Sequence, residues 1–293
     1  MTTYRIEHRT TYAYDADVTG SFGQFHLTPR DLPWQTVHEH ELVIEPGPAT
    51  HHSHLDLYGN TRSTFHVVAP HTELVVRAVS TVEVRRPELP PDVLATPWER
   101  ARPLARTDLE DAWEAADFVF ASPYVDVPEQ VEAYTRESFT PGRPLVEAAT
   151  ELMHRVHDDF RYKSGSTRIG ERVADLLVRR TGVCQDFSHV MVAGLRSLGL
   201  AGRYVSGYLA TRPPPGRPRL VGADASHAWV GVWVPEGGWL HLDPTNNRLA
   251  DESHATVAWG RDYGDVPPVR GVIFSEAKHS TMKVSVDMAP AAP

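Results

Sequence analysis

The sequence predicts a mixed α+β protein in two parts: a β-sandwich-like N-terminal domain, and a core in which one helix packs on an antiparallel sheet. Three observations predict this class. β-Branched and aromatic runs separated by turn residues fill about the first 85 positions. Apolar residues then recur at helical spacing after position 145, and strand-like runs follow those helices. With 293 residues, the chain is long enough for two domains.

Residues 1–85 are predicted to form the β-rich N-terminal domain. Turn formers such as Pro46-Gly47-Pro48 and Gly59-Asn60 separate its β-branched runs, which is typical of a small antiparallel sandwich. The expected strands cover 4–6, 40–44, 65–68 and 74–84.

Residues 86–144 are predicted to form a partly helical connector that packs on the second domain. Prolines at five positions between 87 and 103 interrupt regular structure. Helical segments are expected around 109–116 and 129–138.

Residues 145–293 are predicted to form the second domain. The expected helices cover 146–156, 173–177 and, beginning at or near Cys184, an amphipathic stretch that Gly199 ends. The expected strands cover 203–210, 227–234 and 239–243, with a proline-rich loop at 212–218. A helix buried against these strands gives the α+β architecture.

Charge and hydropathy exclude several partners. Lys and Arg number 29 against 38 Asp and Glu, a net charge of −9, and the basic residues form no cluster, so no nucleic acid partner is expected. The N-terminus lacks the apolar core of a signal peptide, and no apolar run approaches the length of a membrane span. We therefore expect a cytoplasmic protein without a membrane partner.

The chain has a single cysteine, Cys184. One thiol forms neither an intramolecular disulfide nor a multi-cysteine metal site, so Cys184 is either an inert core residue or a nucleophile. Its predicted place at a helix N-terminus favours the reactive thiolate, and nearby N–H groups could face an oxyanion. A buried, inert thiol is nevertheless the commoner fate of a free cysteine.

His227 and Asp243 favour the nucleophile, because a catalytic thiol needs a base and a residue that orients the base. His227 opens one expected strand and Asp243 closes the next. A hairpin symmetric about Pro235 places the two side chains directly opposite each other. A register centred between Glu236 and Gly237 places them on opposite faces instead, so the pairing depends on the turn.

Four segments resemble the bacterial transglutaminase-like cysteine enzymes. These are Thr-Gly-Val-Cys-Gln-Asp-Phe-Ser-His (181–189), Arg-Tyr-Val-Ser-Gly-Tyr-Leu (203–209), Asp-Ala-Ser-His-Ala-Trp-Val (224–230) and Trp-Leu-His-Leu-Asp-Pro-Thr-Asn (239–246). The segment 260–271 and the β-rich first 85 residues also resemble that family. The resemblance implies a papain-like, transglutaminase-like core with Cys184 as nucleophile, His227 as general base and Asp243 as the orienting residue.

The second oxyanion donor stays open, since no glutamine lies between Leu145 and Val183, where papain-like enzymes carry one. Gln185, Tyr162 and Tyr204 are the candidates for it. Trp229 could wall a substrate cleft, although strand tryptophans more often pack in the core.

Three further features have a structural and a functional interpretation. Asp186 and His189 could touch the site, but bracing of the cysteine helix is favoured. The segment from Arg261 to Arg270 could close over the cleft or form a plain surface loop.

Sixteen histidines raise the question of a metal site, but none of their clusters, at 38–40, 51–54 and 154–157, has a recognised catalytic spacing. We expect neither a metal nor another cofactor.

These features predict a cysteine-dependent acyl-transfer enzyme that acts on a peptide or carboxamide bond through a thioester, with hydrolysis as the preferred outcome. Protein-glutamine transglutamination is the close alternative, and a non-catalytic binding protein on the same fold is the alternative of another class. The expected partner is a peptide or protein substrate. The sequence leaves the oligomeric state open.

Overall fold

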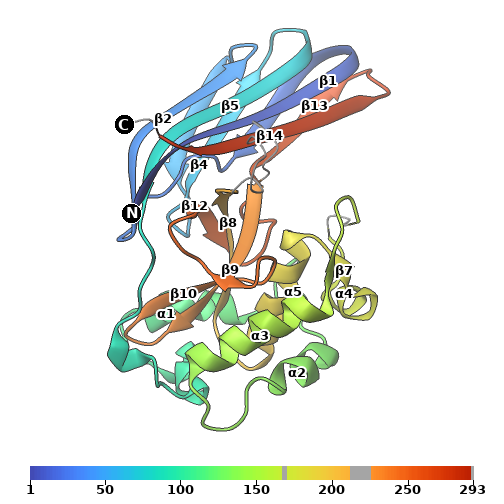
Figure 1. The fold of residues 1–293 in the computed structure, drawn as a ribbon. Helices are drawn as coiled ribbons and strands as arrows, with labels where there is room; N and C mark the ends of the chain where they lie inside the picture. Colours follow the sequence, from blue (N-terminus) through green and yellow to red (C-terminus); the bar gives the residue numbers. More distant parts are fainter. Residues whose placement is uncertain (167–169, 212–225, 292–293) are drawn as a thin grey trace, which may run out of the picture.

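The structure is a computed structural model and describes residues 1–166, 170–211 and 226–291. It has the predicted mixed α+β class: a large curled sheet lies above a smaller sheet that helices cover on its other side (Figure 1). The first and last described strands pair, with Tyr4 beside Pro290, so the two ends of the chain lie close together. The proline-rich loop expected at 212–218 lies outside the described residues.

The upper sheet has seven antiparallel strands among the described residues, in the order β2-β5-β1-β4-β3, with β13 and β14 also paired to β1. The first half of β1 lies between β5 and β14, and its second half lies between β4 and β13. One continuous sheet therefore curls into the sandwich-like shape. Its strands are β1 (Thr2–Phe25), β2 (Gln35–Glu45), β3 (Thr50–Leu55), β4 (Thr61–Val67), β5 (His71–Val84), β13 (Val269–Ser275) and β14 (Ser280–Pro290).

The C-terminal strands β13 and β14 belong to the upper sheet, whereas all of 145–293 was predicted to form the second domain. Both strands expose most of their side chains, and β14 buries Val286 and Met288. β14 carries apolar residues at every second position, Met282, Val284, Val286 and Met288, which is the period of a strand, so the sequence did hold a signal for it. In β13 the apolar residues 272–274 are consecutive and give no alternation.

The lower sheet has five strands in the described part of the chain, in the order β11-β10-β9-β8-β12. Close packing shapes it at Gly207 of β8, where a Cβ atom would lie 2.2 Å from the Ala255 carbonyl oxygen and 2.5 Å from the Trp229 ring. The strands are β8 (Gly202–Leu209), β9 (Ser226–Val234), β10 (Gly238–Asp243), β11 (Arg248–Leu249) and β12 (His254–Gly260).

The predicted helices are present, with small differences at their ends. In the connector, α1 (Ala112–Ala116) and α2 (Glu129–Arg136) follow the three short 3₁₀ turns Pro91–Val93, Trp98–Ala101 and Pro103–Ala105, and a fourth, Asp117–Val119, follows α1. The core contains α3 (Leu145–Asp159), α4 (Val173–Arg179) and α5 (Cys184–Ser197), and a short parallel pair, β6 (Arg161–Tyr162) and β7 (Thr181–Gly182), leads into α5.

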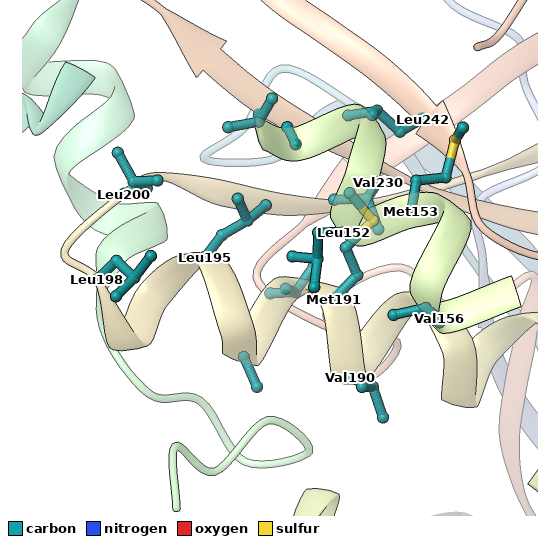
Figure 2. Close-up of a cluster of buried hydrophobic side chains, with 14 of the residues drawn as sticks. Leu152, Met153, Val156, Val190, Met191, Leu195, Leu198, Leu200, Val230 and Leu242 are labelled. Carbon is teal, nitrogen blue, oxygen red and sulfur yellow. The ribbon is translucent and has the colours of Figure 1, made fainter. Parts of the chain in front are cut away.

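Two buried clusters hold α5 and the sheets in place. The first lies between α3, α5 and the lower sheet, and Figure 2 shows its members Leu152, Met153, Met191, Leu195, Val230 and Leu242. The second joins the two sheets and includes Tyr4, Ile6, Val286 and Met288 from above and Tyr208, Ala228 and Val257 from below. Because Cys184 packs against this second cluster, the upper sheet lies next to the start of α5.

Candidate functional site

Cys184 is the first residue of α5, and local hydrogen bonding explains why the helix begins there. Asp186 accepts a hydrogen bond from the Val183 N–H at 2.8 Å, which reproduces one half of a capping box. Gly182 allows this approach, since a Cβ atom there would lie 2.5 Å from the Asp186 carboxylate. The thiol is partly buried at a helix N-terminus whose first N–H groups have no partner within the helix.

His227 and Asp243 lie on one face of the β9–β10 hairpin, but they are not directly opposite as the register about Pro235 predicts. Val234 pairs with Gly238, so the hairpin is centred on Glu236. Glu236 and Gly238 both have positive φ, which gives a three-residue turn. His227 and Asp243 are therefore diagonal neighbours, and their side chains still meet, with His227 Nε2 at 2.8 Å from Asp243 Oδ2.

The Asp243 carboxylate is fully buried, and among the described residues five donors surround it. Oδ1 accepts the backbone N–H groups of Thr245 and Asn246 at 3.0 and 3.1 Å. Oδ2 accepts from His227 at 2.8 Å, from Asn246 Nδ2 at 2.8 Å and from His254 Nε2 at 3.2 Å. Burial raises the pKa of Asp243, but the hydrogen bonds from the two histidines outweigh it and hold the pKa well below its usual range. Asp243 is thus an ionised, fixed group.

His227 connects this carboxylate to the thiol. Its Nε2–H points at Asp243, so Nδ1 is the ring nitrogen left for the hydrogen bond with Cys184. Burial lowers the pKa of His227, but the hydrogen bonds with Asp243 and Cys184 and the charge of Asp243 raise it to about 10. The imidazole is accordingly held ready to carry a proton beside the sulfur.

A pocket of roughly 330 Å³ opens in front of these groups. Cys184 and His227 line it together with Tyr162, Leu209, Thr211, Ser226, Thr245 and Asn246. None of these described lining residues is an Asp, Glu, Lys or Arg. The hydroxyl and amide groups among them can form hydrogen bonds with a neutral amide.

Of the four further site candidates, Tyr162 reaches the pocket. It is half exposed, and burial followed by the charge of Cys184 raises the pKa of its hydroxyl. Gln185 and Tyr204 are not among the described lining residues, and Tyr204 is buried against His189 and Tyr263. Trp229 is fully buried behind the site, where its Nε1–H donates to His241 at 3.0 Å, so it packs in the core and does not wall the pocket.

Asp186 and His189 brace α5, which is the interpretation that the sequence favoured. Beside the Asp186 cap, His189 Nε2 accepts the backbone N–H of Tyr263 at 3.2 Å. The segment from Arg261 to Arg270 contains this tyrosine and the buried Asp262 and Val266, so it packs against α5. It is neither a plain surface loop nor, in this structure, a cover over the pocket.

Sequence reasoning missed two residues of the site, Asn246 and His254. Asn246 lies in the Asp-Pro-Thr-Asn segment that carries the family resemblance, and its position after Asp243 could have suggested a role. His254 opens β12, a strand that was not predicted, and it is 2% exposed. No sequence signal pointed to it, because its burial and its contact with Asp243 appear only in the folded chain.

Among the described residues, no group of three or more His, Cys, Asp or Glu side chains is arranged so that it could hold a metal ion. No helix there combines the length and the apolar character needed to cross a membrane.

Comparison with known proteins identifies similar sequences along most of the chain. The model of the bacterial transglutaminase-like N-terminal region matches residues 4–83, and that of the transglutaminase-like superfamily matches residues 132–244. An uncharacterized protein of Mycobacterium tuberculosis is 44% identical over 98% of this chain and 92% of its own length. An uncharacterized protein of Mycobacterium leprae is 35% identical over 92% of each chain.

Two other similarities are more distant. A protein-glutamine gamma-glutamyltransferase of Pseudomonas aeruginosa is 35% identical over 107 residues, which is 36% of this chain and 16% of that protein. The crystal structure of a candidate cysteine protease from Cytophaga hutchinsonii has a TM-score of 0.72, covers 99% of this chain and 93% of its own, and is 18% identical. This structural similarity is one of fold.

Proposed function

This chain belongs to the bacterial transglutaminase-like family of cysteine enzymes, and on that premise we propose that it catalyses acyl transfer from a peptide or carboxamide bond through a thioester on Cys184. One observation carries the proposal: His227 bonds with the Cys184 thiol on one side and the buried Asp243 carboxylate on the other. This is the arrangement by which a cysteine nucleophile is activated and its base oriented.

In the first step, the sulfur of Cys184 attacks the substrate carbonyl carbon and a C–S bond forms. The C–N bond then breaks, and His227 gives its proton to the departing ammonia or amine. The raised pKa of His227 supports this role, because a protonated imidazole must be available next to the sulfur. Asp243 keeps the ring oriented and stabilises its positive charge.

The developing oxyanion needs donors near the sulfur. The N–H groups of the first turn of α5 supply one set, since they have no partner within the helix. The Tyr162 hydroxyl is our candidate for the second donor, because it lines the same pocket as Cys184.

The second step resolves the thioester. A water molecule gives a proton to His227 and attacks the acyl carbon, the C–S bond breaks, and a carboxylic acid leaves. We prefer this hydrolytic outcome because none of the described lining residues identifies an amine-acceptor site. Transglutamination, in which an amine replaces the water, is the second candidate, and the partial similarity to the Pseudomonas aeruginosa glutamyltransferase favours it.

The test is a screen of peptides and glutamine-containing proteins, with and without a fluorescent primary amine. Hydrolysis predicts release of ammonia or a new amine terminus, and transfer predicts incorporation of the fluorescent amine. Cys184→Ala should abolish either product while keeping its folding transition. If that variant retains the wild-type rate, the proposed mechanism is wrong.

A non-catalytic binding protein is the alternative of a different class. It predicts that peptide ligands bind the wild-type protein and Cys184→Ala equally well and leave both unchanged on prolonged incubation. Mass spectrometry after incubation distinguishes the two functions, because an enzyme converts its ligand to a product and a binding protein leaves it unchanged.

A further inference from the structure

One oxygen atom of Asp243 accepts hydrogen bonds from two histidines. His227 and His254 both place Nε2 near Oδ2, at 2.8 and 3.2 Å. His254 comes from β12 and is nine-tenths or more buried, with its ring edge-on to Trp229 at 5.4 Å between centroids. A carboxylate oxygen is an acceptor, so each of these nitrogens must carry a proton.

The other side of His254 meets both a donor and an acceptor. The backbone N–H of Asp251 points at His254 Nδ1 from 3.1 Å, and a backbone N–H can donate but not accept. In the neutral ring that accepts this bond, Nδ1 carries no proton and Nε2–H faces Asp243. Asp251 Oδ1 also lies 3.1 Å from Nδ1, so a second proton on the ring would meet a carboxylate there as well.

We propose that His254 is a positioning residue of the reaction described above: its Nε2–H fixes the Asp243 carboxylate and shares Oδ2 with His227, which limits how strongly Asp243 holds the proton of His227. The inference rests on the proposed function, since it concerns the same catalytic groups. His254 is not among the described residues that line the pocket, so it acts through Asp243 and not on the substrate.

The charged and titratable groups that face His254 and Asp243 come from five segments. His227 is on β9, Asp243 and His241 are on β10, and Cys184 is on α5. Asp251 lies in the turn before β12. Arg248, on β11, lies 3.5 Å from Asp251. Both protonation states of His254 donate to Asp243 Oδ2. Removal of this donor therefore changes the charge available on Oδ2 in the same direction in either state.

Sharing an acceptor has a definite sign. Two donors on one carboxylate oxygen compete, because each reduces the negative charge available to the other. Removal of the His254 donor leaves more of that charge to the His227 imidazolium, so the thiolate–imidazolium pair should persist to lower pH. Removal of the Asp243 charge has the opposite sign, since the imidazolium then loses its counter-ion.

The experiment follows the alkylation rate of Cys184 by iodoacetamide against pH, which needs no substrate. His254→Asn is one bond too short to reach Oδ2, whereas His254→Gln keeps an N–H donor of similar reach. His254→Met fills the space without a donor and replaces His254→Asn if that protein does not fold. Asp243→Asn is the reference of opposite sign, and circular dichroism confirms that each variant is folded.

We expect the acid limb of the alkylation profile to move down by roughly one pH unit in His254→Asn, because one hydrogen bond to a charged group changes a pKa by about that much. We expect His254→Gln to restore most of the wild-type position, and Asp243→Asn to move the limb up. A limb that stays in place or moves up in the no-donor variants overturns the inference, because loosened packing around Asp243 would act in that direction.

The inference and the proposed function fail in different ways. If His227→Ala leaves the wild-type alkylation profile unchanged, no reactive pair exists and the proposed function is contradicted. If His227→Ala changes the profile but His254→Asn and His254→Met do not lower the acid limb, the pair exists and only the role of His254 is wrong.

Discussion

At the scale of single residues, the site depends on one buried carboxylate. Asp243 accepts from two histidines, one asparagine side chain and two backbone N–H groups. A buried charge is tolerated when its hydrogen bonds are complete, and it then fixes the groups that donate to it. The orientation of His227 toward Cys184 thus follows from the environment of a third residue.

Asp243→Asn should therefore remove most activity without unfolding the protein. The amide keeps the size of the side chain but loses the charge, so the pKa of His227 falls because Cys184 alone then opposes the effect of burial. We expect turnover to decrease by about 10³- to 10⁴-fold, as for an asparagine in the same role of a serine protease triad. The exposed Asp158→Asn is the matched control, and equal losses in both variants would contradict this role.

A second residue-scale prediction concerns His8, which is buried between the two sheets. Burial lowers its pKa to about 4 from 6.5, and its ring bonds with Thr10 at 3.0 Å and Tyr208 at 3.1 Å. Because the folded pKa is depressed, the neutral ring favours folding above about pH 6.5, and this contribution is lost as the pH falls toward 4.

Because of His8, the free energy of unfolding should accordingly fall by about 2 kcal/mol when the pH is lowered from 7 to 5. Urea unfolding at pH 7 and at pH 5 measures this fall in unfolding free energy. In His8→Gln the fall should be smaller than in wild type by the contribution of His8. The exposed His52→Gln should keep the wild-type dependence. An unchanged dependence in His8→Gln would show that His8 does not cause the acid sensitivity.

At the scale of elements, the start of α5 sets where the sulfur lies. The Asp186 side chain lies against Gly182 and accepts the Val183 N–H, so the turn and the cap are one unit. The diagonal register of the β9–β10 hairpin sets where the imidazole lies. Helix start and hairpin turn together place the Cys184 sulfur next to the His227 imidazole.

Gly182→Ala tests the first of these elements. The added Cβ would lie 2.5 and 2.6 Å from atoms of Asp186, so the cap must move. We expect a loss of roughly 1 to 3 kcal/mol in unfolding free energy and at least a tenfold loss of activity, because Cys184 is two residues away. Gly47→Ala has nothing within 4 Å of the new Cβ and should change neither quantity. Wild-type behaviour of Gly182→Ala would refute this account of the helix start.

Elements whose apolar residues recur with a strong period were predictable from the sequence. Elements whose position depends on pairing with another strand were not. α3 buries one apolar face, and α5, which is buried on all sides from Asp186 to Arg196, still carries apolar residues at helical spacing, so the spacing predicted both within a few residues. The sequence also identified the Cys184, His227 and Asp243 set, but the hairpin register required the backbone of Glu236 and Gly238. His254 was missed because β9 and β8 lie between β10 and β12 in the lower sheet, and no local sequence pattern shows that its side chain meets Asp243.

At the scale of the whole molecule, the two sheets form one folded unit. β14, the last strand, pairs with β1 and packs Val286 and Met288 into the cluster that also borders Cys184. The upper sheet therefore supports the site although it contributes none of the described residues that line the pocket. The cytoplasmic location and the peptide or protein partner remain predictions.

Two methionines of β14 test this support. Met288 is 1% exposed and Met282 is 62% exposed. Met288→Ala should cost about 2 to 4 kcal/mol of unfolding free energy, since it leaves a cavity between the sheets, whereas Met282→Ala should stay within about 0.5 kcal/mol of wild type. Guanidinium unfolding followed by tryptophan fluorescence measures both. Equal stability of the two variants would mean that the sheets do not depend on this contact.

The central claim is that Cys184 and His227 form a reactive pair, and the alkylation rate of Cys184 tests it most directly because the chain has a single cysteine. Iodoacetamide is applied to wild type and to His227→Ala from about pH 5 to about pH 10. We predict that wild type reacts roughly ten-fold faster or more near pH 6, and that the two rates converge at alkaline pH, where any exposed thiol ionises. Equal rates at every pH, with both proteins folded, would contradict the claim.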